Sequence, residues 1–183
     1  MKKTPVTTIV AIGIGAALFF VLGRFVTVPS PVPNTNISIQ YGLLAFMAAM
    51  FGPVAGALIG LIGHALIDFS FGWGIWWSWV IASGCFGAFI GFAAGKLKLE
   101  DGEFGTRGMI TFNVFQAIGH AAAWVLIAPV LDIVMYAEPA NKVFVQGLVS
   151  GCVNIVTTAI VGTLLCVAYA ASKPKQGSLR REN

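Results

Sequence analysis

The chain has 183 residues, of which 57% are hydrophobic and 10% are charged, whereas roughly 25% of the residues in an ordinary soluble domain are charged. This composition excludes a soluble globular protein and indicates that most of the chain lies in a lipid bilayer. The formal net charge of +4 comes from basic residues at the chain ends and in one loop. We therefore interpret it as a topology signal and not as a surface for nucleic acid.

The first predicted membrane span covers residues 6–26. It follows two lysines, as a secretory signal does, but no Ala-x-Ala cleavage pattern comes after it, so we expect the span to be retained. The residues that share one of its faces are Ala11, Gly15 and Phe19, with Gly13 and Ala17 beside them. Small residues at this spacing let helices approach closely, either inside the bundle or against another membrane subunit.

A polar, uncharged segment with prolines at positions 29, 31 and 33 follows and contains Asn34 and Asn36. It is too rich in proline for a helix, so we expect a stiff, extended lid or plug. The next uncharged stretch, residues 37–67, is interrupted by Gly52-Pro53 and is either one kinked helix or two short ones. The positive-inside rule favours two, because the lysine clusters on either side then face the same compartment.

The predicted spans are residues 6–26, 38–52, 53–69, 76–95, 108–131 and 143–171. We thus predict an all-α integral membrane protein, a single domain over residues 1–183, with six transmembrane helices and both termini in the cytoplasm. The nine basic residues on the cytoplasmic side are Lys2, Lys3, Lys96, Lys98, Arg107, Lys173, Lys175, Arg180 and Arg181. Only Arg24 and Lys142 lie at the outer boundary.

The connection between the third and fourth spans holds four of the five tryptophans, Trp73, Trp76, Trp77 and Trp79. Tryptophan favours membrane interfaces in general. A cluster this dense equally fits an aromatic wall for a planar ligand. Both interpretations stay open at this point.

Two stripes of uncharged polar residues lie at helical spacing in the last two spans. They are Asn113, Gln116 and His120 in the fifth span, and Gln146, Ser150 and Asn154 in the sixth. The stripes either bond to each other and hold the helices together, or line a cavity for a polar organic ligand. Glycines at every fourth position in three spans are expected to pack helices closely, within the bundle or against a partner.

His64, Asp68 and His120 provide the one potential metal-ligand set, and an intramembrane metal-dependent enzyme is accordingly a second hypothesis. No HExxH-type motif supports it, and a hydrogen bond from Asp68 to His64 or to a tryptophan indole explains the pair as well. The sequence contains no P-loop, GxSxG or dinucleotide fingerprint. We expect neither an enzyme nor a cofactor, and any ATP-driven transport must be powered by a partner.

Several segments together resemble the UPF0397 family of membrane proteins. They are residues 10–17, residues 21–25, residues 29–41 (PSPVPNTNISIQY), Phe51-Gly52-Pro53, residues 60–68 (GLIGHALID) and Trp77-Ser78-Trp79. That family is grouped with the substrate-binding S components of energy-coupling factor (ECF) vitamin transporters, and is similar to the riboflavin type. The resemblance covers nearly the whole chain.

The resemblance implies a six-helix S component that captures a vitamin or vitamin precursor from outside, in the bacterial plasma membrane. Its implied partners are a membrane-embedded coupling subunit (T component) and two cytoplasmic ATPases. The binding residues expected from the resemblance and the polar stripes are Asn34, Asn36, Gln40, His64, Asp68, Trp73, Trp77, Asn113, Gln116, His120 and Asn154. S components dock through an Ala-x-x-x-Ala pattern in the first span, for which the nearest match is Ala11-x-x-x-Gly15, continued by Phe19.

The tryptophan-rich connection favours a planar heterocycle such as riboflavin as the ligand. Hydroxymethylpyrimidine, thiamine-like and corrinoid molecules are the alternatives. The shortage of buried positive charge argues against a ligand with several negative charges, because a desolvated phosphate favours arginine or lysine.

Overall fold

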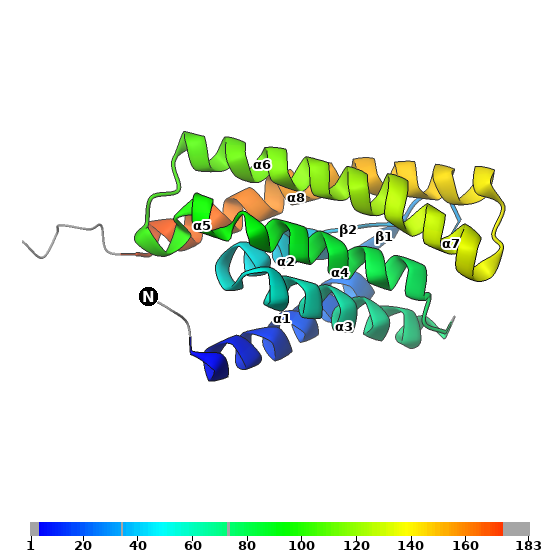
Figure 1. Cartoon of the computed structure of the whole chain (residues 1–183), viewed down its shortest axis with the longest axis horizontal. Helices are drawn as coiled ribbons and strands as arrows, with labels where there is room; N and C mark the ends of the chain where they lie inside the picture. Colours follow the sequence, from blue (N-terminus) through cyan, green and yellow to red (C-terminus); the bar gives the residue numbers. More distant parts are fainter. Residues whose placement is uncertain (1–3, 34, 73, 174–183) are drawn as a thin grey trace, which may run out of the picture.

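The computed structural model describes residues 4–33, 35–72 and 74–173, and most of these residues are helical. The helices lie side by side in one elongated bundle (Figure 1). In chain order the elements are α1 (Pro5–Phe25), β1 (Thr27–Pro29), β2 (Asn36–Ser38), α2 (Gln40–Phe51), α3 (Pro53–Phe71), α4 (Trp77–Phe92), α5 (Ala94–Leu97), η1 (Leu99–Asp101), α6 (Thr106–His120), η2 (Ala121–Ile127), α7 (Ala128–Tyr136) and α8 (Ala140–Ala171).

The prediction of a helical membrane protein is confirmed, apart from the two short strands. Among the described residues, four helices are long and apolar enough to cross a membrane: α1, α3, α8 and the continuous helix Thr106–Tyr136. A fifth is reached if α4 is counted with Ala94–Asp101, which follows it at a bend of 45°. The remaining apolar helix, α2, has 12 residues, fewer than the roughly 20 that span a bilayer.

The predicted helix break at Gly52-Pro53 is confirmed. Gly52 has a φ of +85°, which glycine adopts without the strain of a side chain, and Pro53 begins α3, where its missing N–H costs nothing. The chain reverses at this break. A Cβ on Gly23 of α1 would touch both Gln40 at the start of α2 and Ile67 near the end of α3, so these two helix ends lie close together. Hence α2 and α3 are antiparallel.

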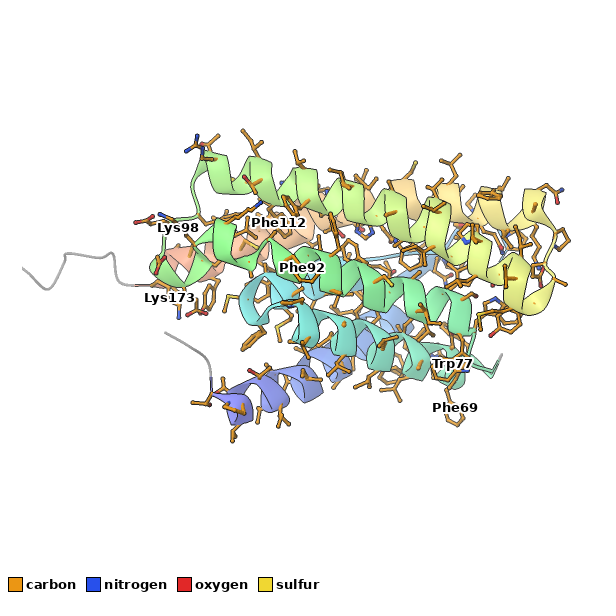
Figure 2. The ribbon with its side chains drawn as sticks, in the orientation of Figure 1. Phe69, Trp77, Phe92, Lys98, Phe112 and Lys173 are labelled. Carbon is orange, nitrogen blue, oxygen red and sulfur yellow. The ribbon has the colours of Figure 1, made fainter. Side chains whose placement is uncertain are left out.

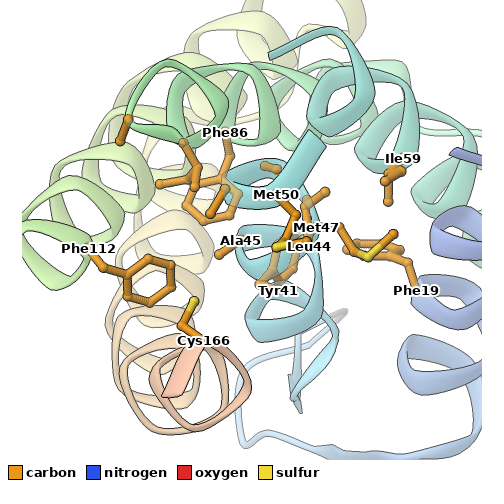
Figure 3. Packing of buried hydrophobic residues seen from close by; sticks show 14 of the residues in the cluster. Phe19, Tyr41, Leu44, Ala45, Met47, Met50, Ile59, Phe86, Phe112 and Cys166 are labelled. Atoms are coloured by element: carbon orange, nitrogen blue, oxygen red, sulfur yellow. The ribbon is translucent and has the colours of Figure 1, made fainter. Parts of the chain in front are cut away.

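The short helix α2 lies at the centre of the bundle, and nine of its 12 residues are buried. Figure 3 shows its side chains Tyr41, Leu44, Ala45 and Met47 surrounded by the other helices. The buried partners around it are Phe19 of α1, Ile59 of α3, Phe86 of α4, Phe112 of α6 and Cys166 of α8. Because its neighbours cover it, α2 needs little contact with lipid.

The glycine stripes pack helices of the chain against each other. A Cβ on Gly87 of α4 would clash with the backbone carbonyl of Gly56 in α3, and one on Gly60 would lie 2.5 Å from the carbonyl oxygen of Ser83. The two helices therefore touch backbone to backbone, which is the arrangement that small residues allow in membranes.

The predicted docking face of α1 (Ala11, Gly15 and Phe19) is covered by the chain itself. Ala11 is 7% exposed and Phe19 is fully buried. A Cβ on Gly15 would lie 2.6 Å from Cδ1 of Ile59 in α3. The neighbouring small residues Gly13 and Ala17 are exposed instead, because they lie on the other side of the helix.

The long helix Thr106–Tyr136 contains a π-helical segment, η2, at its middle. Pro129 follows this segment and has no N–H to donate to the carbonyl of Trp124, five residues earlier. That carbonyl instead lies against Gly147 of α8, where a Cβ would clash with it. The wide turn thus accommodates the proline and brings α8 close.

The proline-rich segment forms a small β-hairpin. Strands β1 and β2 pair antiparallel, with Thr27 opposite Ser38. Of the described residues in the predicted extended segment 29–36, only Pro29 and Asn36 belong to a strand. The others connect the two strands, whose pairing was not predicted. Gln146 of α8 donates a hydrogen bond from Nε2 to the carbonyl oxygen of Pro33, at 2.9 Å, and so connects the hairpin to the last helix.

Both ends of the described chain lie at the same end of the bundle, together with α5 and the connection from α4 to α6 (Figure 1). Figure 2 shows Lys98 and Lys173 at this end, and Phe69 and Trp77 at the opposite end. Lys98 and Lys173 thus lie at the end of the bundle that holds both ends of the described chain.

Candidate ligand-binding cavity

A cavity of about 280 Å³ lies where the hairpin, the connection from α3 to α4, and the start of α8 meet. Its volume is at the lower end of the range for small-molecule sites, about 300–1,000 Å³. Polar side chains that line it are Thr35, Asn36, Ser38, Gln40, Tyr41, His64, Asp68, Asp132, Glu138, Lys142, Gln146, Ser150 and Asn154. Its aromatic lining comprises Tyr41, Phe71, Trp76, Trp79 and Trp124.

Asp132 of α7 holds the tryptophans of this cavity in place. Its Oδ1 accepts hydrogen bonds from Nε1 of Trp76 and from the hydroxyl of Ser78. Its Oδ2 accepts one from Nε1 of Trp79, at 2.8 Å. Since an indole N–H only donates, both oxygens of Asp132 act as acceptors.

Asp68 of α3 begins a second polar network. Its Oδ2 accepts from the backbone N–H of Trp76 at 2.9 Å, and its Oδ1 lies 3.5 Å from Nε2 of His64, one helical turn earlier. Nδ1 of His64 is 2.6 Å from Oγ of Ser83, which also lies 2.8 Å from the hydroxyl of Tyr41. The network therefore joins α3, α4 and the start of α2 under the cavity.

Stacked aromatic rings form the wall of the cavity. The rings of Trp79 and Trp124 stack with centroids 5.6 Å apart and an interplanar angle of 21°. Tyr41 meets Trp124 edge to face at 5.1 Å. On the outer side, Trp76 stacks on Tyr136 at 4.5 Å. Among the rings that line the cavity, Tyr41 comes from α2, Trp79 from α4, Trp124 from η2 and Trp76 from the connection before α4.

Gln40 contributes a buried acceptor that has no partner. Its side chain lines the cavity and is 8% exposed, and its Oε1 makes no hydrogen bond. A buried polar atom without a partner costs about 1–3 kcal/mol, so this atom is available to a donor that enters the cavity.

The structure brings five of the predicted site residues together in the cavity: Asn36, Gln40, His64, Asp68 and Asn154. Four others lie outside its lining: Trp77, Asn113, Gln116 and His120. The remaining two, Asn34 and Trp73, lie outside the described residues.

The predicted stripe on α6 bonds to α8 and does not face the cavity. Nδ2 of Asn113 donates to Oγ1 of Thr163 at 2.9 Å, and Nε2 of Gln116 donates to the carbonyl oxygen of Ile155 at 3.2 Å. Of the two interpretations left open for the polar stripes, the stripe on α6 therefore fits the one in which its side chains hold two helices together. The predicted stripe on α8 (Gln146, Ser150 and Asn154) lines the cavity instead.

His120 is fully buried and both of its ring nitrogens are bonded. Nε1 of Trp124 donates to its Nδ1 at 2.8 Å, so the neutral ring carries its proton on Nε2, which donates to Oγ1 of Thr158 at 2.9 Å. The ring also stacks on Phe86 with centroids 3.9 Å apart. His120 therefore orients Trp124 from behind the cavity.

Trp77 points away from the cavity. Its side chain is 47% exposed and lies in a shallow apolar groove with residues of α3. Of the four clustered tryptophans, Trp76 and Trp79 line the cavity, whereas Trp77 fits the alternative of an interfacial position.

Sequence reasoning missed Asp132 and the pair formed by Glu138 and Lys142. Asp132 directly follows the predicted span 108–131, and no role was predicted for it. A signal for it was present, because four-residue steps from His120 through Trp124 lead to Asp132. Lys142 lies 2.7 Å from Glu138, a pair at i, i+4 spacing that the sequence also contains.

No group of three or more His, Cys, Asp or Glu side chains that could hold a metal ion occurs within residues 4–33, 35–72 and 74–173. Of the three residues considered for a metal, His64 and Asp68 are neighbours, but His120 is engaged elsewhere through both ring nitrogens. The observed donor set thus gives no support to the metal-dependent enzyme.

The fold defines a multi-pass helical membrane protein with a cavity at one end of the bundle, and comparison with known proteins agrees with this fold. A solved structure described as the S component for biotin from an ECF-type ABC transporter has a TM-score of 0.61 and 18% identity, over 90% of this chain and 93% of that one. At that identity the likeness concerns the fold alone.

The family described as the ECF-type riboflavin transporter S component matches residues 3–171. A UPF0397 protein of Enterococcus faecalis V583 is 54% identical over 181 residues, which is 99% of each chain. A UPF0397 protein of Staphylococcus aureus MSSA476 is 52% identical over the full length of both. The chain belongs to the ECF-type riboflavin transporter S-component family, and the predicted resemblance and location in the cell membrane are confirmed.

Proposed function

We propose that this chain is the substrate-binding subunit of an ECF importer and captures a small planar vitamin or vitamin precursor in the cavity. The observation that carries the proposal is the cavity lining, in which Trp76, Trp79 and Trp124 accompany side chains able to form directional hydrogen bonds. Such a set binds a planar organic ligand by stacking and hydrogen bonding. Riboflavin is the first candidate, since the family carries that name.

The ligand contacts that we propose come from Asn36, Gln40, His64, Asp68 and Asn154. Each lines the cavity, and each contributes an amide, an imidazole or a carboxylate. Asn113, Gln116 and His120 support the site indirectly in this proposal, because they fix α6 and Trp124 against α8.

We also propose six membrane crossings, with both termini in the cytoplasm and the cavity near the outer surface. The end of the bundle that holds Lys98 and Lys173 would face the cytoplasm (Figure 2), in accord with the positive-inside rule. The central helix α2 counts as one crossing in this arrangement, although it is short, because other helices shield it from lipid.

A membrane coupling subunit and two cytoplasmic ATPases are the proposed partners, and the chain itself is proposed to bind without turnover. The exposed small residues Gly13 and Ala17 provide the docking face on α1, in place of Ala11 and Gly15. A coupling helix can approach the α1 backbone closely there, as small residues allow in membranes.

The test is a titration of the purified, detergent-solubilised protein with riboflavin, followed by tryptophan fluorescence. Saturable quenching at nanomolar to low-micromolar riboflavin would identify a flavin as the ligand. Trp79→Phe should reduce the quenched fraction, while the control Trp77→Phe, on the opposite side of the helix start, should leave the quenched signal of the cavity unchanged.

Uptake measurements complete this test. Cells that produce the chain with a coupling subunit and ATPases should accumulate the ligand, and cells that produce the chain alone should not. Quenching by another vitamin but not by riboflavin changes the ligand and retains the function. Folded protein that binds no vitamin of a panel of pyrimidine, thiamine-like, flavin, biotin and corrinoid compounds contradicts the proposal.

A further inference from the structure

We infer that the ligand of this cavity is an organic cation, namely a compact planar nitrogen heterocycle that carries a positive charge and hydrogen-bond donors. The inference rests on the proposed function, because it specifies the chemical class of the ligand in the same cavity.

The charge of the lining carries the first step. Three carboxylates line the cavity, Asp68, Asp132 and Glu138, against one lysine, Lys142. Nζ of Lys142 lies 2.7 Å from Oε2 of Glu138, so the charges of these two side chains cancel. His64 is the remaining titratable group, and the lining is negative whether its imidazole is neutral or protonated. A negative cavity attracts a cation and repels an anion.

Asp132 is the least compensated of these charges. All of its hydrogen bonds come from neutral donors, the indoles of Trp76 and Trp79 and the hydroxyl of Ser78. Within the described parts of the chain no ion pair involves Asp132. Neutral donors orient a carboxylate without cancelling its charge, and a buried charge without a counter-charge is costly. A cationic ligand would offset that cost.

Arg24, the other basic residue at the cavity end of the bundle, does not supply a counter-charge for Asp132. The guanidinium of Arg24 lies over the ring of Phe71, 4.3 Å from its centroid, and Arg24 is not among the residues that line the cavity. The cavity thus keeps its negative charge with both outer basic residues taken into account.

The unpartnered Oε1 of Gln40 is a second and independent observation. This acceptor is buried at 8% exposure of its residue and lines the same cavity. An acceptor is satisfied only by a donor, such as an amino group or a protonated ring nitrogen. A cationic heterocycle with an N–H donor therefore meets both the charge of the lining and this unpartnered acceptor.

The aromatic wall is suited to a charged ring. Trp76, Trp79 and Trp124 all line the cavity, and tryptophan has the most favourable ring face for a cation. A flat cation stacked there would gain from the ring faces and from the charge of the carboxylates at once, whereas an uncharged flavin would gain from stacking and hydrogen bonds but not from charge attraction.

The experiment compares three probes by isothermal titration calorimetry: thiamine, which is a cation, riboflavin, which is uncharged, and biotin, which is an anion. We expect thiamine to bind at least tenfold more tightly than the other two. N1-methylnicotinamide and nicotinamide serve as a matched pair that differs by one methyl group and one charge, and the cation should bind more tightly.

Two variants test the origin of the preference. Asp132→Asn should weaken thiamine binding at least tenfold, but it also removes an acceptor from the tryptophans and can affect folding. Lys142→Met avoids this difficulty, because its side chain is 45% exposed and its removal leaves Glu138 uncompensated. It should tighten thiamine binding severalfold. The matched control is Lys98→Met, which breaks the exposed ion pair with Glu103 at the opposite end and should leave the affinity unchanged.

Saturable binding of riboflavin or biotin without binding of thiamine overturns this inference and leaves the proposed function standing. Weaker or unchanged thiamine affinity in Lys142→Met overturns it as well. If none of the vitamin panel binds to folded protein, and ATP-dependent uptake is absent with all partners present, the proposed function fails, and the inference fails with it.

Discussion

Replacing Gly147 with alanine should disturb both the stability of the bundle and the cavity. A Cβ at this position would clash with the carbonyl oxygen of Trp124 and lie 3.0 Å from Cγ of Pro129. Real Cβ atoms essentially never approach another heavy atom more closely than 3.0 Å. The obstacle is backbone at the π-helical segment, so it cannot rotate away, and α8 has to move. Overpacking of this kind costs about 1–3 kcal/mol.

Gly151, one turn further along α8, provides the matched control. A Cβ there would lie 3.5 Å from Cβ of Trp124 and 3.6 Å from Cγ2 of Val125, which are ordinary contacts. Gly151→Ala should therefore be neutral or stabilise the protein by up to about 1 kcal/mol, because alanine favours helix more than glycine does.

Thermal unfolding in detergent, followed by tryptophan fluorescence, measures the difference between these two variants. Gly147→Ala should unfold several degrees below the natural protein and bind ligand more weakly, since Trp124 lines the cavity. Equal unfolding temperatures for Gly147→Ala and Gly151→Ala would refute the reasoning that this helix contact is set by the backbone.

Three further predictions use the same assays. Gln40→Met should raise the unfolding temperature, because it removes an acceptor whose burial costs about 1–3 kcal/mol, while ligand affinity falls; lower stability in the ligand-free state would contradict this. Gly13→Leu should block co-purification of the coupling subunit and keep ligand binding, whereas Ala11→Leu should destabilise the fold. The opposite pattern would favour the docking face first predicted, with Ala11 and Gly15 in contact with the coupling subunit. His120→Phe should cost about 2 kcal/mol, because Trp124 loses its acceptor, and unchanged near-ultraviolet circular dichroism would exclude that role.

The sequence predicted the helices well because each rests on a local property. Uncharged runs gave the positions of α1, α3 and α8 to within a few residues, and Gly52-Pro53 gave the break before α3. The glycine spacing also indicated close packing of helices. It could not indicate which helices pair, since that depends on contacts between residues far apart in the chain.

The cavity was predicted only in part, for a related reason. Periodicity places Asn113 and Gln116 on one face of a helix, but it cannot say whether that face meets another helix or an open space. The face of α6 meets α8, whose Thr163 hydroxyl and Ile155 carbonyl accept hydrogen bonds from the amide nitrogens of Asn113 and Gln116. Asp132 was missed because a charge at the end of an apolar run resembles a boundary residue, and only the fold shows that two indoles converge on it.

The π-helical segment divides one long helix into two parts, one that packs against α8 and one that holds the tryptophans of the cavity. Before it, Asn113 and Gln116 of α6 donate hydrogen bonds to α8. After it, Asp132 accepts hydrogen bonds from Trp76 and Trp79 at the start of α4. A π turn contains one residue more than an α turn, so a chain that loses one residue within Ala121–Ile127 can close this turn to an α turn while the rest of the helix keeps its orientation. Such a deletion would leave Asp132 facing both indoles, but it would remove the wide turn that places the carbonyl of Trp124 against Gly147. In evolutionary terms, one residue of chain length here controls how closely α8 approaches, independently of the carboxylate that holds the tryptophans.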